Sequence, residues 1–78
     1  MKKKYVITSD GFPILFDEAL IHKHVSLNYT ISSAGFFKTS IIQPENRIKV
    51  TCWGESSSLH IRSKPETDEK IIEALLNE

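Results

Sequence analysis

The single cysteine and the three histidines are the residues of this sequence best suited to chemistry. Cys52 and His60 could work as a thiolate and its base, since a nucleophilic thiolate needs a neighbouring proton acceptor. The expected hairpin register pairs Cys52 with Leu59, however, and so places the Cys52 and His60 side chains on opposite faces of the sheet. We therefore interpret Cys52 as a small buried core residue and predict no catalytic pair here.

His22 and His24 could ligate a metal ion, with His60 or Cys52 as a third ligand. On a strand, residues two apart share a face, but on a helix they point about 200° away from each other and do not converge on one ion. The surrounding segment favours a helix, and single exposed histidines are usually polar surface. The sequence therefore predicts no metal site and no cofactor.

Two short segments contain residues of known catalytic or phosphate-binding motifs without their spacing. Residues 54–58, Gly-Glu-Ser-Ser-Ser, lack the final glycine of the Gly-x-Ser-x-Gly nucleophile elbow and lead into a strand. Residues 32–35, Ser-Ser-Ala-Gly, lack the glycine spacing and the Lys-Ser/Thr pair of a phosphate loop. We interpret the first as a loop and the second as a strand bulge or bend where Gly35 allows close backbone approach. These patterns favour a protein that is not an enzyme.

The composition indicates a foldable domain in a reducing compartment. Of the 78 residues, 40% are apolar and 26% are charged, and so short a chain is expected to form a single domain over residues 1–78. One cysteine cannot form an intramolecular disulfide, which argues against the secreted, disulfide-rich class. Three lysines follow Met1, but no signal-peptide apolar run comes after them, and no stretch approaches a transmembrane length. We expect a cytoplasmic location without membrane contact.

Charge is balanced overall but unevenly distributed along the chain. Ten basic and ten acidic side chains give a formal net charge of zero, which provides no global attraction to nucleic acid or anionic lipid. Residues 1–64 carry nine Lys and Arg against five Asp and Glu, whereas residues 65–78 carry one against five. The acidic end is consistent with the surface of a C-terminal helix.

The N-terminal segment predicts a β-hairpin. Residues 5–8 and 13–16 have strand propensity, and the Asp-Gly pair between them supplies a two-residue turn. Such a turn would place Ile7 opposite Ile14 and leave one face of the hairpin apolar. Pro13 lacks an N–H donor, so it belongs at the first residue of its strand or on an edge strand.

Residues 17–27 break the strand alternation. Leu20 with His24, and Ile21 with Val25, lie four residues apart, which predicts a short helix of about two turns. The acidic residues at positions 17 and 18 would lie at its positive N-terminal end.

The middle of the chain predicts a three-stranded antiparallel meander, whose strands are residues 29–42, 47–53 and 58–62. Two four-residue loops separate them, so Ile42 is expected opposite Arg47 and Trp53 opposite Ser58. Both hairpins then agree on one buried face. That face consists of Phe37, Thr39, Ile41, Ile48, Val50, Cys52, Leu59 and Ile61.

The C-terminal residues predict an amphipathic helix that starts at Pro65. Ile71 with Leu75, and Ile72 with Leu76, form an apolar stripe that needs a partner surface. The residues expected to point outward are Glu69, Lys70, Glu73, Asn77 and Glu78. The buried face of the meander is the obvious partner. The fold class is therefore α+β, a small antiparallel sheet of order β-β-α-β-β-β-α covered on one face by the C-terminal helix.

The other face of the meander is expected to be exposed and to carry aromatic and basic side chains. The candidate binding residues on it are Phe36, Lys38, Lys49, Trp53, His60 and Arg62. An apolar, aromatic patch of this kind marks protein contact, with a different partner or with a second copy of the chain. Basic residues among aromatics on a sheet are also what single-stranded nucleic-acid platforms use.

From these features we expect a small cytoplasmic interaction module that mediates protein-protein contact or homodimerisation through the exposed face of its sheet. Single-stranded nucleic-acid binding through the same face is the alternative, and the zero net charge weakens it. An enzyme would need a concave site, which so short a chain usually builds only across a subunit interface. No small-molecule ligand is evident.

Overall fold

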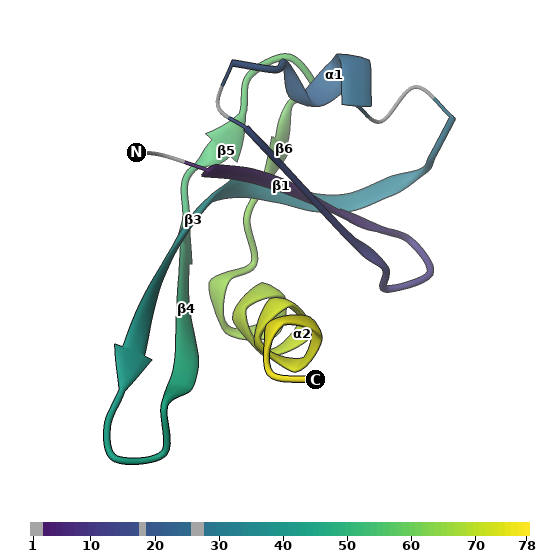
Figure 1. The fold of residues 1–78 in the computed structure, drawn as a ribbon. Coiled ribbons are helices and arrows are strands. Elements are labelled where there is room, and N and C mark those ends of the chain that lie inside the picture. The colour runs from purple at the N-terminus through teal and green to yellow at the C-terminus, as the bar shows by residue number, and fades with distance from the viewer. Residues whose placement is uncertain (1–2, 18, 26–27) are drawn as a thin grey trace.

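The elements of the chain assemble into a main antiparallel sheet with a helix on each side of it (Figure 1). The computed structural model describes residues 3–17, 19–25 and 28–78. The elements, in chain order, are β1 (Lys3–Thr8), β2 (Pro13–Asp17), α1 (His22–Val25), β3 (Ile31–Ile42), β4 (Arg47–Trp53), β5 (Glu55–Ser56), β6 (Ile61–Arg62) and α2 (Pro65–Leu76). The main sheet has the strand order β2-β1-β3-β4, and α2 packs against β4. The expected α+β architecture, with a sheet packed against the C-terminal helix, is confirmed.

The β1–β2 hairpin forms as expected, but its register differs by one residue from the prediction. Ile7 lies opposite Pro13, one residue before the expected partner. The N–H of Thr8 donates to the carbonyl of Phe12 at 2.9 Å, which makes a three-residue loop ending on Gly11. Gly11 has a φ of 82°, the left-handed conformation that closes such loops. The Asp-Gly pair therefore forms part of a longer loop than the two-residue turn predicted.

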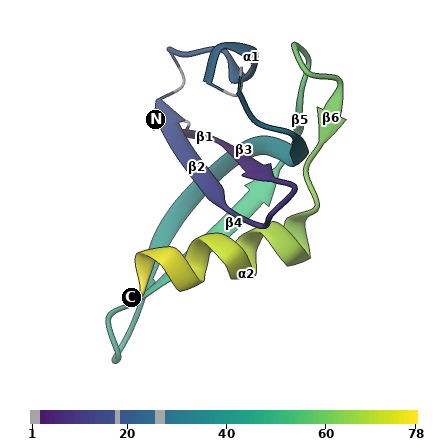
Figure 2. The same cartoon turned by 90° about the vertical axis from the view of Figure 1, so that its right-hand side faces the viewer.

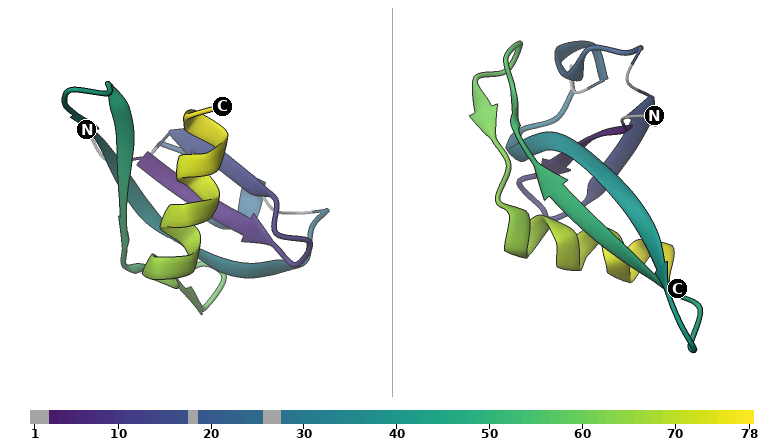
Figure 3. Two further views of the ribbon diagram at one scale, coloured as in Figure 1. Left: turned by 90° about the horizontal axis from the view of Figure 1, so that it is seen from below. Right: turned by 90° about the vertical axis from the view of Figure 1, so that its left-hand side faces the viewer.

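The β3–β4 hairpin has the predicted register. Ile42 lies opposite Arg47, and the pairing continues without a break to Phe36 opposite Trp53. The first part of β3 pairs with β1, so β3 is a central strand. The tip of the hairpin projects past the C-terminal end of α2 (Figure 3).

The predicted third strand of the meander is wrong. After Trp53 the chain leaves the main sheet and forms the two-stranded sheet β5–β6, in which Glu55 lies opposite Arg62. Gly54 makes this departure possible, because its φ of 82° is a conformation that glycine adopts without steric cost. The outer edge of β4 lies instead beside α2, as Figure 2 shows.

Side chains of α2 bind the peptide groups along the outer edge of β4. In three pairs a helix side chain accepts a hydrogen bond from a strand N–H, at 2.8, 3.0 and 2.9 Å: Glu69 with Cys52, Glu73 with Val50, and Asn77 with Ile48. Four helical residues rise about 6 Å and two strand residues about 6.8 Å, so the two spacings match. The prediction that Glu69, Glu73 and Asn77 only point outward is therefore wrong.

The core lies between α2 and the central strands. It consists of Tyr5, Ile7, Phe37, Val50, Cys52 and Ile72. The far end of the predicted buried face stays uncovered, since Ile41 is 66% exposed, Thr39 is exposed and Ile48 is only half-buried. Leu59 and Ile61 leave this face with the β5–β6 segment. The helix lies along the edge of the sheet, so it covers less of the face than the sequence predicts.

A buried polar cluster attaches the first turn of α2 to the sheet. Asp68 is 1% exposed. Its carboxylate accepts hydrogen bonds from the Tyr5 hydroxyl at 2.5 Å, the Ser33 hydroxyl at 2.7 Å and the Lys64 backbone N–H at 2.8 Å. All three of these groups donate, and the carboxylate oxygens accept. Pro65 occupies the first turn as predicted, and the bond from Lys64 caps the helix beside it.

On the opposite face of the sheet, α1 forms one turn that His22 anchors. The helix spans His22–Val25, which is shorter than the two predicted turns, and position 18 lies outside the described residues. The expectation that His22 belongs to a polar surface is wrong. Its side chain is 4% exposed, and its Nε2–H donates to the Gly35 carbonyl at 2.9 Å. A carbonyl only accepts, so this bond keeps the proton on Nε2.

Candidate functional site

The aromatic part of the predicted interaction face forms a packed cluster. Phe36 and Trp53 lie opposite each other, and their rings stack with centroids 6.1 Å apart and planes inclined by 27°. The His22 ring meets Phe36 edge to face at 5.9 Å and Phe16 at 5.2 Å between centroids. Phe36 and Trp53 are consequently half-buried. They present part of their surface to solvent and part to each other and to α1.

Burial has the largest effect on His22 and lowers the pKa of its imidazole. The hydrogen bond to the Gly35 carbonyl opposes this shift, and the Lys4 ammonium adds to it. A neutral ring suits a site between two phenylalanines, because burial disfavours the charged form of an imidazole. His22 therefore acts as a packing residue that holds α1 on the sheet.

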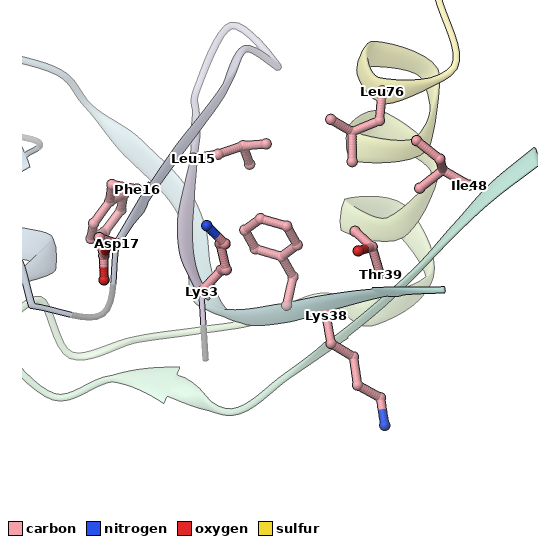
Figure 4. Close-up of a pocket in the computed structure, with 9 residues that line it drawn as sticks. Lys3, Leu15, Phe16, Asp17, Lys38, Thr39, Ile48 and Leu76 are labelled. Carbon is pink, nitrogen blue, oxygen red and sulfur yellow. The ribbon is translucent and has the colours of Figure 1, made fainter. Parts of the chain in front are cut away.

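Basic side chains continue the same face toward the tip of the β3–β4 hairpin. Strand alternation from Phe36 and Trp53 places on it Lys38, Ser40, Ile42, Arg47, Lys49 and Thr51. We name the three exposed cations among them, Lys38, Arg47 and Lys49, the basic stripe. The Lys38 side chain points away from the α2 side of β3 (Figure 4). No acidic residue belongs to this face of the hairpin.

His60 and Arg62 are not brought onto this face by the strand pairing. Arg62 belongs to β6 and lies opposite Glu55. His60 is exposed in the turn before β6, with a φ of 57°. Their predicted place depended on pairing with β4, and β6 pairs with β5 instead. The structure brings together four of the six predicted residues on one face: Phe36, Lys38, Lys49 and Trp53.

Cys52 is buried in the core, as predicted. Burial raises the pKa of its thiol to about 12, which keeps it protonated and unreactive. Burial, followed by the hydrogen bond to Asp68, also raises the pKa of the Tyr5 hydroxyl. These side chains and Ser33 are all buried, so this polar cluster positions α2 and offers no access to a substrate.

A groove that the sequence analysis missed, lined by apolar and polar residues, opens on the α2 face of the sheet (Figure 4). Its volume is about 670 Å³, and its apolar lining comes from Leu15 of β2, Phe37 of β3, Ile48 of β4 and Leu76 of α2. In Figure 4, Leu15 stands on one side and Leu76 and Ile48 on the other. The groove exists because α2 lies along β4 and leaves the β2 side of the sheet open.

The groove ends at the outer edge of β2. The Thr8 N–H donates to the Phe12 carbonyl, and hydrogen-bonded pairs alternate along an antiparallel ladder. The residues whose peptide groups face outward are therefore Pro13, Leu15 and Asp17. No element of residues 3–17, 19–25 and 28–78 pairs with this edge. Unpaired apolar strand edges are sites of association unless a charge or a bulge blocks them.

Comparisons of the chain with protein-family models, with curated proteins and with solved structures gave no match. Within the part of the chain that the structure describes, no group of three or more His, Cys, Asp or Glu is placed to hold a metal ion. No helix among those residues is long and apolar enough to cross a membrane.

Proposed function

We propose that this chain is a non-enzymatic, cytoplasmic interaction module that associates with a second copy of itself through its sheet. The observation that carries the proposal is the apolar groove, which opens beside a strand edge without a partner in the described part of the chain. Exposed contiguous apolar surface on a small protein marks an interaction site. A chain of 78 residues also has little core of its own and gains stability when a neighbour covers such a surface.

A second copy suits this surface better than a strongly charged partner. Lys3 and Asp17 lie opposite each other at the β1–β2 end of the groove, so that end carries both signs of charge. The remaining lining is mostly apolar, with Leu15, Ile48 and Leu76 partly exposed. Lys38 also lines the groove, so a copy of the same surface brings equally apolar residues and an excess of only one positive charge. The buried area is then favourable without a compensating ion pair.

The solution mass of the purified chain tests the proposal. Light scattering from micromolar to millimolar concentration should give a dimer whose mass is the same at low and high salt, because apolar contacts are not screened. A monomer at every concentration contradicts the proposal. Trp53→Ala is the matched control, since it alters the opposite face. If Trp53→Ala abolishes the dimer while the chain stays folded, the contact lies on the Phe36–Trp53 face and the groove is the wrong surface.

A second candidate function is single-stranded nucleic-acid binding, which the basic stripe favours. Lys38, Arg47 and Lys49 are exposed on the same face as the stacked Phe36 and Trp53. Cations beside partly exposed rings suit a backbone phosphate and a stacked base. Trp53 is the single tryptophan, so its fluorescence reports directly on this face. Quenching by a single-stranded oligonucleotide at low salt, lost at high salt and weakened by Lys49→Glu, supports this function, and no quenching at low salt removes it.

A further inference from the structure

We infer that β2 pairs antiparallel with the β2 strand of a second copy, about a twofold axis at Leu15, so that two four-stranded sheets become continuous. This inference rests on the proposed self-association and specifies its geometry. It follows from the difference in cover between the two sheet edges, from the hydrogen-bonding groups of β2 and from the position of the chain at Leu20.

The two outer edges of the main sheet differ in what binds their outward peptide groups. Along β4, each outward N–H of Ile48, Val50 and Cys52 donates to a side chain of α2, at 2.9, 3.0 and 2.8 Å. Along β2, the outward peptide groups have no strand or helix beside them in the described part of the chain. Side chains of α2 thus cover the edge of β4, whereas the edge of β2 can still accept a partner strand. Open edges pair with other strands by main-chain hydrogen bonds.

The hydrogen-bonding groups of β2 select one register of self-pairing. With the axis at Leu15, each Leu15 N–H donates to the Leu15 carbonyl of the other copy, and each Asp17 N–H donates to a Pro13 carbonyl. The reverse bond from Pro13 to Asp17 is not required. Pro13 has no N–H, and the Asp17 carbonyl already accepts the N–H of Leu20 at 3.1 Å. Every outward group of the edge is therefore satisfied.

Neighbouring registers satisfy fewer groups. Moving the axis to Ile14 places Pro13 opposite Leu15 and leaves the Leu15 carbonyl without a donor. Moving it to Phe16 places the Pro13 carbonyl opposite Ala19, which lies beyond the end of β2 and whose N–H already donates to the Asp17 side chain at 3.4 Å. An unsatisfied buried peptide group costs more than the bond it replaces gains. The axis at Leu15 is consequently the favoured arrangement.

The chain after β2 leaves room for a partner strand. The Lys4 Nζ donates to the Leu20 carbonyl at 2.7 Å. Lys4 lies opposite Phe16, on the face of the sheet that α1 covers, so the chain at Leu20 lies over that face. It does not continue outward in the plane of the sheet, where the second β2 strand would lie.

The side chains of the edge are also compatible with this pairing. Leu15 of each copy would lie side by side on the α2 face, where the two grooves become one continuous apolar surface. On the other face Ile14 would lie beside Phe16 of the second copy, an aliphatic-aromatic pair that stabilises antiparallel strands. Asp17 would lie opposite Pro13, so no like charges meet across the axis.

A cysteine placed on the axis provides the test. In a hydrogen-bonded antiparallel pair the Cα atoms are about 5.5 Å apart. That separation lies within the disulfide range of roughly 4.4 to 6.8 Å. Leu15→Cys should form a covalent dimer on mild oxidation and keep the native circular dichroism. The unaltered chain serves as one control, because Cys52 is buried. Ile41→Cys serves as the other, since it adds an exposed thiol on the same face but far from β2 along the sheet.

Two outcomes separate this inference from the proposed function. If light scattering shows a dimer while Leu15→Cys stays unlinked and Ile41→Cys links, the β2 pairing is wrong and self-association stands. If the chain is a monomer throughout, both are wrong. A second pair of variants tests the backbone itself, because Leu15→Pro removes the outward N–H and Leu15→Ala retains it. Leu15→Pro should weaken the dimer about tenfold or more beyond Leu15→Ala, the effect of two hydrogen bonds. Equal affinities of the two variants overturn the inference.

Discussion

At the scale of single residues, the Asp68 carboxylate joins three segments of the chain. It accepts from Tyr5 on β1, from Ser33 on β3 and from the N–H of Lys64 before α2. Tyr5→Phe removes one donor from this buried carboxylate and should lower the free energy of unfolding by about 1–3 kcal/mol. Urea denaturation measures the loss. Tyr29→Phe is the matched control, because Tyr29 is exposed, and an equal loss in both variants contradicts this role for Asp68.

The burial of His22 predicts that part of the free energy of unfolding depends on pH. Burial lowers its pKa in the folded state, so below the ordinary histidine pKa of about 6.5 the unfolded chain binds more protons than the folded one. The contribution of His22 to the free energy of unfolding is fully present above about pH 6.5 and decreases as the pH falls below that value. Thermal denaturation of His22→Gln should show a weaker loss on acidification than the unaltered chain. His24→Gln, at an exposed position, should retain the full loss, and identical pH profiles for both variants contradict the prediction.

At the scale of elements, α2 serves as both a core helix and a cover for a strand edge. Ile72 enters the core, while the side chains of Glu69 and Glu73 bind the edge of β4. The helix therefore takes the place that a fifth strand would occupy in a larger sheet. This arrangement explains why neither β5 nor β6 pairs with β4.

Removing one of these edge contacts tests the role of the helix. Glu73→Ala leaves the Val50 N–H without its acceptor and should cost about 1 kcal/mol of stability. Amide hydrogen exchange at Val50 should accelerate more than exchange at its neighbours on β4. Glu66→Ala is the matched control, since Glu66 is exposed in the first turn of the same helix. Unchanged exchange at Val50 in Glu73→Ala contradicts the proposed edge contact.

At the scale of the whole molecule, self-association couples stability to concentration. A dimer that forms only from folded chains raises the Tm as protein concentration increases. Leu15→Lys places a charge at the centre of the β2 edge, and natural edge strands use such charges to prevent pairing. This variant should unfold at a Tm that does not depend on concentration. A concentration-dependent Tm in Leu15→Lys places the contact elsewhere on the molecule.

Several features of the fold could be predicted from the sequence because they depend on neighbours along the chain. The register of β3 and β4 follows from a four-residue loop between two alternating segments. The predicted register is correct for every pair from Phe36–Trp53 to Ile42–Arg47. Pro65 marks the start of α2, and the burial of Cys52 follows from its place among apolar alternating residues. The β1–β2 register was wrong by one residue, because an Asp-Gly pair also fits a three-residue loop closed by glycine.

The type of most elements, and the pairing across several of their short loops, thus follow from the sequence, because local geometry leaves few alternatives there. Which element covers each edge and face of the sheet depends on contacts between segments that are distant in the sequence. The N–H groups of β4 can bond to a third strand or to the carboxylates of Glu69 and Glu73, and the choice depends on long-range packing of α2. The burial of His22 and the open edge at Leu15 have the same origin, because both depend on how far a helix extends over a sheet that it meets only after folding.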